Sequence, residues 1–137
     1  MSTKPTPIAL VVCDNIYQEP GGKTALVGLF NNINARKLPV RHARMVVFAS
    51  VTDLRPGSKA RLEIVHGESE KVVVRLEGPF PKEADPVSVV DFNFVLNNLV
   101  FEEDGTHYIR FWVNDYLIVM RPFEVRVIPE RQEPHGQ

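Results

Sequence analysis

Side chains that branch at Cβ constrain the fold of this chain more than any other feature. Twenty Val and seven Ile together make up 27 of its 137 residues, against ten Leu and seven Ala. Branched side chains lose rotamer freedom in a helix and pack well on a pleated sheet, whereas helices favour Leu and Ala. Eleven Pro and eight Gly provide the turns that many short strands need. We therefore predict an all-β protein with about eight or nine strands and no major helix.

The order of apolar and charged residues predicts individual strands. Residues 24–33 are apolar almost throughout, which is typical of a strand covered on both faces, and Gly28 within them indicates a bulge or a close backbone approach. Residues 59–64 and 71–77 alternate apolar with charged side chains, as the two strands of a half-buried antiparallel hairpin do. These patterns favour two antiparallel sheets packed as an immunoglobulin-like β-sandwich.

Length and charge limit the domain organisation and the partners. We place one domain at residues 7–129 and expect flexible tails at residues 1–6 and 130–137, which are polar and contain proline. Sixteen Lys and Arg against 17 Asp and Glu give a net charge of −1, which argues against nucleic acid as the main partner. The apolar stretch 8–13 is too short for a signal peptide or a membrane span. A lone Cys13 excludes an intramolecular disulfide, so we expect a cytoplasmic protein that does not bind membranes.

No arrangement of residues in the sequence predicts catalysis, a cofactor or a metal centre. Cys13 has no histidine at a spacing that marks a nucleophile and its base. The run Gly21-Gly22-Lys23-Thr24 lacks the first glycine of a phosphate-binding loop and precedes a predicted strand rather than a helix. No two of the four histidines are two or four residues apart, as ligands on one strand or helix would be. We therefore expect a protein that is not an enzyme and holds no cofactor.

The last predicted hairpin, residues 106–121, carries more apolar surface than one interior can cover. Its second strand is apolar on both faces, so one apolar set must point outward. The set that we expect in the core is Ile109, Phe111, Val113, Phe123, Val125 and Val127. The set that we expect on the outer face is Tyr108, Arg110, Trp112, Tyr116, Ile118 and Met120. Trp, Tyr, Met and Arg are enriched at the centres of protein interfaces.

The outer face of this hairpin leads to the functional expectation. We expect a non-enzymatic protein–protein interaction module that self-associates or docks a protein partner through the outer face of residues 106–121. One alternative is that the loop 34–42 or the C-terminal tail covers this face within the same chain. Another is a sandwich that binds calcium or a carbohydrate at its end loops, where Asp14, Asp53 or residues 102–104 supply carboxylates.

Two sequence patterns resemble an uncharacterised family of bacterial β-sandwich proteins. The N-terminal pattern is Cys13-Asp14-Asn15-Ile16, then Glu19, Gly22-Lys23, Leu26-Val27-Gly28-Leu29-Phe30 and Ile33. The C-terminal pattern is Gly105, Phe111 and Val113, followed by Arg121-Pro122-Phe123-Glu124-Val125. The resemblance covers most of residues 8–128. It implies an immunoglobulin-like fold and a small cytoplasmic protein, and it brings no activity or catalytic residue with it.

Overall fold

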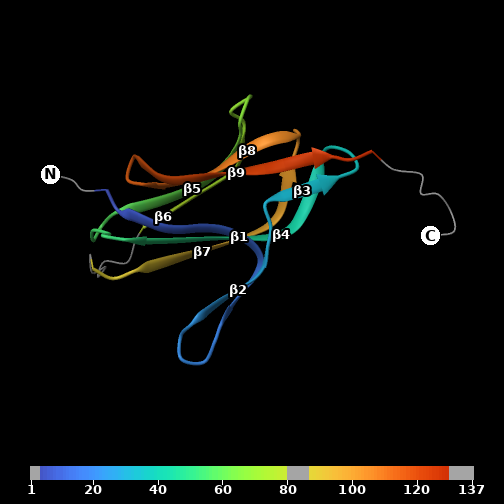
Figure 1. The fold of residues 1–137 in the computed structure, drawn as a ribbon. Coiled ribbons are helices and arrows are strands. Elements are labelled where there is room, and N and C mark those ends of the chain that lie inside the picture. The colour runs from blue at the N-terminus through green and yellow to red at the C-terminus, as the bar shows by residue number, and fades with distance from the viewer. Residues whose placement is uncertain (1–3, 80–86, 130–137) are drawn as a thin grey trace.

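The computed structural model describes residues 4–79 and 87–129 of the chain. These residues form nine strands and no helix, so the described part has no helix that could cross a membrane (Figure 1). The strands are β1 (Thr6–Gln18), β2 (Thr24–Leu29), β3 (Asn32–Ala35), β4 (Val40–Thr52), β5 (Lys59–His66), β6 (Val72–Pro79), β7 (Val90–Phe101), β8 (Gly105–Val113) and β9 (Tyr116–Val127). The predicted all-β fold is confirmed. Of the predicted tails, Lys4 and Pro5 lead directly into β1, while residues 1–3 and 130–137 lie outside the described residues.

The strands pair into two sheets. Sheet A has the order β2-β1-β4-β7, and sheet B has the order β3-β9-β8-β5-β6. Neighbouring strands are antiparallel except β3 and β9, which are parallel. Sheet B curls like half of a barrel (Figure 1). The two layers agree with the predicted two-sheet arrangement.

The core lies between the sheets, and alternate residues of each strand fill it. On β4 the inward residues include Met45, Val47 and Ala49, which are fully buried. On sheet B, Phe111 and Phe123 are also fully buried. Each large apolar side chain contributes about 1.5–3 kcal/mol when it leaves water. Because a shift of one residue would turn this whole set outward, the core fixes the register of both sheets.

The predicted phase of the last hairpin is confirmed for β8 and, on β9, for Phe123 and Val125. The buried members of the predicted core set are Ile109, Phe111, Val113, Phe123 and Val125. The prediction is wrong for Val127, which is exposed. The pairing of β8 with β9 extends only to Val125, opposite Gly105, so Val127 lies beyond the end of β8.

The prediction that residues 24–33 form one strand covered on both faces is wrong. The segment forms β2 in sheet A and β3 in sheet B. β1 pairs with β4 as far as Cys13 and with β2 from Cys13 onward. The second half of β1 therefore leaves the sheet together with β2 as a two-stranded arm (residues 14–28). Figure 1 shows this arm on the side of sheet A that faces away from sheet B.

Gly28 shapes the base of the arm. Its φ is +77°, and a Cβ atom at this position would lie 2.6 Å from Oδ2 of Asp14. The prediction of a bulge or a close backbone approach at Gly28 is met only in part, because the group that approaches its backbone is the side chain of Asp14. Nearby, Nε of Arg44 donates a 3.0 Å hydrogen bond to Oδ1 of Asn15, which ties the arm to β4.

Candidate interaction surface

The outer face of sheet B presents two rows of side chains that run across four strands. Residues directly opposite each other in an antiparallel pair point to the same face, so the register defines these rows. One row consists of Leu117 on β9, Trp112 on β8, Arg61 on β5 and Glu77 on β6. The next row consists, in the same strand order, of Met120, Arg110, Glu63 and Arg75. These eight residues form the outer patch.

A β-bulge in β9 decides which of its residues join the outer patch. Phe111 pairs with Val119, but the next residue, Trp112, pairs with Leu117. Ile118 is therefore the extra residue of the bulge. Both Ile118 and Val119 pack against the core, which breaks the alternation of inward and outward side chains along β9.

The bulge changes the predicted outer set. The predicted residues that do lie on the outer side are Tyr108, Arg110, Trp112 and Met120. Ile118 turns to the core instead. Tyr116 lies opposite the inward residue Val113, and Nζ of Lys4 is 5.0 Å from the centre of its ring. Leu117 takes the outer place beside Trp112 and is exposed. The uninterrupted apolar run of β9 is the sequence signal for this loss of alternation.

Glu63 lies at the centre of the outer patch and is only 4% exposed. Its Oε1 accepts the indole N–H of Trp112 at 2.9 Å, and its Oε2 accepts Nε–H of Arg75 at 3.2 Å. Arg61 and Arg110 lie 3.8 and 3.9 Å from the same carboxylate. A buried carboxylate is tolerated where such donors replace its water. Glu63 therefore holds three arginines and one tryptophan in one arrangement.

Trp112 is held at its face as well as at its edge. The guanidinium of Arg61 lies 4.7 Å from the ring centre, within the range of a cation–π contact. Next to the ring, Leu117 and Met120 are exposed, and the side chain of Arg75 is half exposed. The outer patch thus combines a fixed aromatic–arginine centre with an exposed apolar edge on β9.

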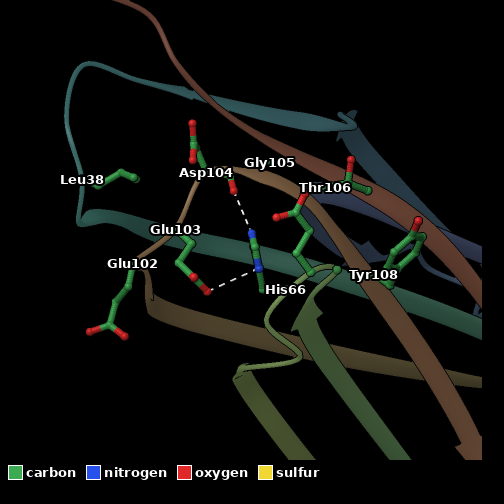
Figure 2. A pocket seen from close by; sticks show the side chains of 10 residues that line it. Leu38, His66, Glu102, Glu103, Asp104, Gly105, Thr106 and Tyr108 are labelled. Atoms are coloured by element: carbon green, nitrogen blue, oxygen red, sulfur yellow. Dashed lines mark hydrogen bonds and ion pairs between the residues drawn. The ribbon is translucent and has the colours of Figure 1, made fainter.

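Of the two segments predicted as alternative covers, the loop 34–42 leaves this edge open. In the loop 34–42, Leu38 lines a pocket at the end of sheet B, across from Tyr108 (Figure 2). The C-terminal tail lies outside the described residues. Within the described part of the chain, Leu117 and Met120 stay exposed.

The pocket at the end of sheet B has a volume of about 670 Å³ and opens between the β5–β6 and β7–β8 turns (Figure 2). Nε2 of His66 lies 2.8 Å from the carbonyl oxygen of Asp104, so this nitrogen carries the proton and donates it. Nδ1 accordingly accepts the backbone N–H of Ser69 at 3.1 Å. The hydroxyl of Ser69 donates to Oε2 of Glu103 at 2.7 Å.

This serine, histidine and glutamate bond to one another and to the backbone of the two turns. A nucleophilic serine passes its proton to histidine, and the histidine is oriented by the acid. Here the Ser69 hydroxyl donates to Glu103 and also lies 3.0 Å from Nδ1 of His66, while both ring nitrogens of His66 bond to backbone groups. The cluster therefore closes the β5–β6 turn onto the β7–β8 turn.

Among the described residues, three groups have shifted pKa values with structural causes. The hydrogen bond from Ser69 lowers the pKa of Glu103. Burial lowers the pKa of His107, whose ring centre lies 5.0 Å from that of His66 and 5.3 Å from that of Phe101. Burial also raises the pKa of the Cys13 thiol. His107 is therefore held in its neutral form, and the reactive thiolate of Cys13 is disfavoured.

The carboxylates of the calcium alternative do not meet. β4 starts at Val40, opposite Phe101, and Asp53 follows the other end of β4, so Asp53 and Glu102 lie at opposite ends of the sheet. Asp14 lies at the base of the arm, away from both ends. Within residues 4–79 and 87–129, no three His, Cys, Asp or Glu side chains are grouped so that they could hold a metal ion.

Comparison with known proteins places the chain in a family. A search of curated proteins found no match. The sequence pattern of one family covers residues 8–126, which include nearly all of the two sheets and both segments that carried the resemblance. The predicted membership of an uncharacterised family is thereby confirmed. The chain belongs to the family of unknown function DUF6941.

Proposed function

We propose that the protein is a non-enzymatic interaction module that docks a protein partner through the outer patch. The observation that carries this proposal is the cluster around Glu63, in which Trp112 and three arginines are already held in place. Side chains that are ordered before binding lose little further conformational entropy when a partner arrives. Trp and Arg are also the residues in which the energy of interfaces concentrates.

The outer patch favours a partner that presents an acidic group beside apolar side chains. Three arginines against Glu63 and Glu77 give the eight residues a net charge of +1, and Glu70 lies 3.6 Å from Arg110 at the rim, so Arg75 is the arginine best placed to meet an acidic group. Arg75 uses Nε and one Nη on Glu63, and the remaining donors of its half-exposed guanidinium are available to a carboxylate. Leu117 and Met120 offer apolar contact next to these donors. The partner's apolar residue would pack there and exclude water from the charged contact.

The non-enzymatic part of the proposal is supported by the pocket at the end of sheet B. His66 uses both ring nitrogens on backbone groups, and the Ser69 hydroxyl, although it lies 3.0 Å from Nδ1 of His66, donates to Glu103. A general base needs a free lone pair directed at the nucleophile. In this pocket the lone pair of the histidine is occupied by the turn itself.

Comparative affinity capture tests the proposal. Immobilised wild type is compared with Met120→Asp and Leu117→Asp, which place a carboxylate in the apolar edge of the outer patch. Val27→Asp, on the arm, is the matched control, because Val27 is 48% exposed and Met120 47%. The proposal expects a partner that binds wild type and Val27→Asp and binds both patch variants at least about tenfold more weakly. A partner that binds all four proteins equally contradicts it, as does a wild type that captures no partner.

A carbohydrate site is the second candidate, and a pocket of about 330 Å³ beside Trp112 favours it. Asn114 and Asp115 of the β8–β9 turn line this pocket together with Lys59. Amide and carboxylate groups beside an aromatic ring suit a sugar, which has both hydroxyl groups and apolar C–H faces. Titration with neutral oligosaccharides, followed by the fluorescence of Trp112, tests this candidate, and an unchanged spectrum removes it.

Two finer assignments accompany the proposal. We infer an immunoglobulin-like variant of the two-sheet fold, because the chain passes from sheet A to sheet B between β2 and β3. We infer a cytoplasmic location, because the single cysteine, Cys13, is a buried free thiol. An experimental structure with β2 and β3 in one sheet would contradict the first assignment. Recovery of the protein from a membrane or secreted fraction would contradict the second.

A further inference from the structure

A second apolar surface lies on the outer face of sheet A, on the opposite side of the molecule from the outer patch. Val46 and Cys13 point to this face outside the core between the sheets, and both are fully buried, so the chain itself already covers this part and the exposed apolar surface lies around it. Beside them, Val11 and Phe48 are partly buried and Val95 is exposed. These five residues form the sheet A face.

The arm adds exposed apolar side chains next to the sheet A face. Val27 is 48% exposed, Leu29 at the base of the arm is 66% exposed, and Tyr17 is also exposed. Ile16 and Leu26, which are paired on the other side of the arm, are only partly buried. A two-stranded ribbon is marginally stable by itself in water, and this one is apolar on both sides. The arm therefore has the character of a segment that packs against something.

The outer edge of β2 is open and unprotected. β2 is the last strand of sheet A, and within the described residues this edge pairs with no other strand. Edge strands usually carry charged residues or proline that discourage pairing with another chain. β2 carries neither, since its sequence is TALVGL. An edge of this kind is suited to contact with a second chain.

Charges on β4 and β7 identify the second chain as another copy. The successive rows across these strands are Arg44 with Asn97, Val46 with Val95, Phe48 with Asn93, and Ser50 with Asp91. The exposed Arg44 and Asp91 thus flank the apolar rows at opposite ends. If the strands of the second copy run antiparallel to those of the first, the Arg44 row of each chain lies over the Asp91 row of the other. A copy in the same direction would instead stack Arg44 on Arg44.

We propose that two copies of this chain pack through their sheet A faces as a symmetric dimer, with the arm of each copy laid against the other. The contact uses the same residues on both sides, so it closes at two subunits. It covers Val27, Leu29 and Val95 and places Arg44 beside Asp91 of the other copy. Because the outer patch lies on sheet B, each dimer would present two outer patches to partners.

Sedimentation velocity over a concentration series tests the dimer with the full chain. Wild type is expected at twice the chain mass of 15.5 kDa. Val27→Asp and Leu29→Asp are expected to sediment as monomers with the circular dichroism of wild type. Met120→Asp, which has the same degree of exposure as Val27 but lies on sheet B, is expected to remain a dimer. A wild type that stays monomeric at every concentration overturns the proposal, as does a dimer that survives both arm variants or is lost in Met120→Asp.

A charge reversal separates docking from folding. Arg44→Asp puts like charges beside each other across the contact and is expected to raise the dimer dissociation constant by about tenfold. Adding Asp91→Arg restores the opposite charges and is expected to recover most of the lost affinity. A double variant no tighter than Arg44→Asp alone overturns the proposed orientation. Sedimentation tests the dimer contact on sheet A, whereas affinity capture tests partner binding to the outer patch on sheet B. Failure of the dimer and failure of the proposed function are therefore distinguishable.

Discussion

The indole N–H of Trp112 donates a 2.9 Å hydrogen bond to the carboxylate of Glu63, 49 residues earlier in the chain. The bond joins β8 to β5 on the outer face of sheet B. Arg61 lies over the indole ring, and Arg75 bonds the other oxygen of the carboxylate. The alternation of side chains along the sequence predicts a mainly apolar outer face here. The structure shows an ordered aromatic–arginine cluster with an apolar edge.

Removing the charge of Glu63 should destabilise the fold. Glu63→Gln keeps the shape of the side chain but removes the carboxylate that Arg61 and Arg75 face, and it leaves Arg110 with Glu70 alone. Because these arginines are partly exposed, we expect a loss of about 1–3 kcal/mol rather than the larger cost of a fully buried pair. Urea unfolding followed by the fluorescence of Trp112, the single tryptophan, measures it. Glu77→Gln, on the exposed neighbouring strand, should change stability by less than about 0.5 kcal/mol. Equal effects of the two variants would mean that Glu63 does not organise the patch.

Two glycine substitutions should separate backbone strain from steric clash. Gly22 and Gly28 both have positive φ, but a methyl group added at Gly22 meets open space, whereas one added at Gly28 collides with Asp14. Gly22→Ala should cost about 1 kcal/mol from strain alone. Gly28→Ala should cost about 1–2 kcal/mol more, because Asp14 must move. Thermal unfolding of the two variants provides the comparison, and a Gly28→Ala variant as stable as Gly22→Ala would contradict the tight base of the arm.

Stability should fall in mildly acidic solution because of His107. Its folded pKa lies below the ordinary value of 6.5, so the unfolded chain takes up the proton first. The stabilisation is complete above about pH 6.5 and is lost as the pH falls from there toward the folded pKa. His107→Asn keeps a donor for the carbonyl of Gly105 but does not titrate. Melting curves between about pH 7 and 5 should show a flatter pH dependence for this variant than for wild type. An identical slope would assign the effect to another group.

Cys13 should be inert to thiol reagents in the folded protein. Its side chain is fully buried, and burial raises its pKa, so both access and thiolate formation are hindered. Labelling with a chromogenic disulfide reagent should be slow in buffer and complete in denaturant. As Cys13 is the single cysteine, the signal needs no deconvolution. Rapid labelling of the native protein would show that the sheet A face opens in solution.

Sequence patterns predict the fold correctly wherever one face of a strand is buried and the other face is exposed to solvent. The alternation in residues 59–64 and 71–77 correctly predicts the pairing of β5 with β6, and the phase of β8 is also correct. The prediction fails for residues 24–33. An apolar strand with one face exposed to solvent has the same composition as an apolar strand with both faces covered, so composition cannot separate the two. Only the bend of β1 at Cys13, a tertiary feature, distinguishes the two cases.

The candidate site could be predicted only in part. Arg110, Trp112 and Met120 follow from the alternation of β8 and β9. The bulge at Ile118 instead places Tyr116 opposite Val113, where its side chain stays exposed, and brings Leu117 to the outer face. The sequence pattern predicts that the central residue, Glu63, points outward and is exposed to solvent. Its burial depends on side chains that two other strands, β6 and β8, bring to it, and a single sequence does not specify that cross-strand register.

Fluorine NMR of protein labelled with 5-fluorotryptophan tests docking through the outer patch most directly. The label is confined to Trp112, so one resonance reports on the centre of the patch. We expect this resonance to shift or broaden when the captured partner is added, and to stay unchanged with Met120→Asp at the same partner concentration. A wild-type resonance that does not move while the partner is bound to saturation would show that the partner docks elsewhere.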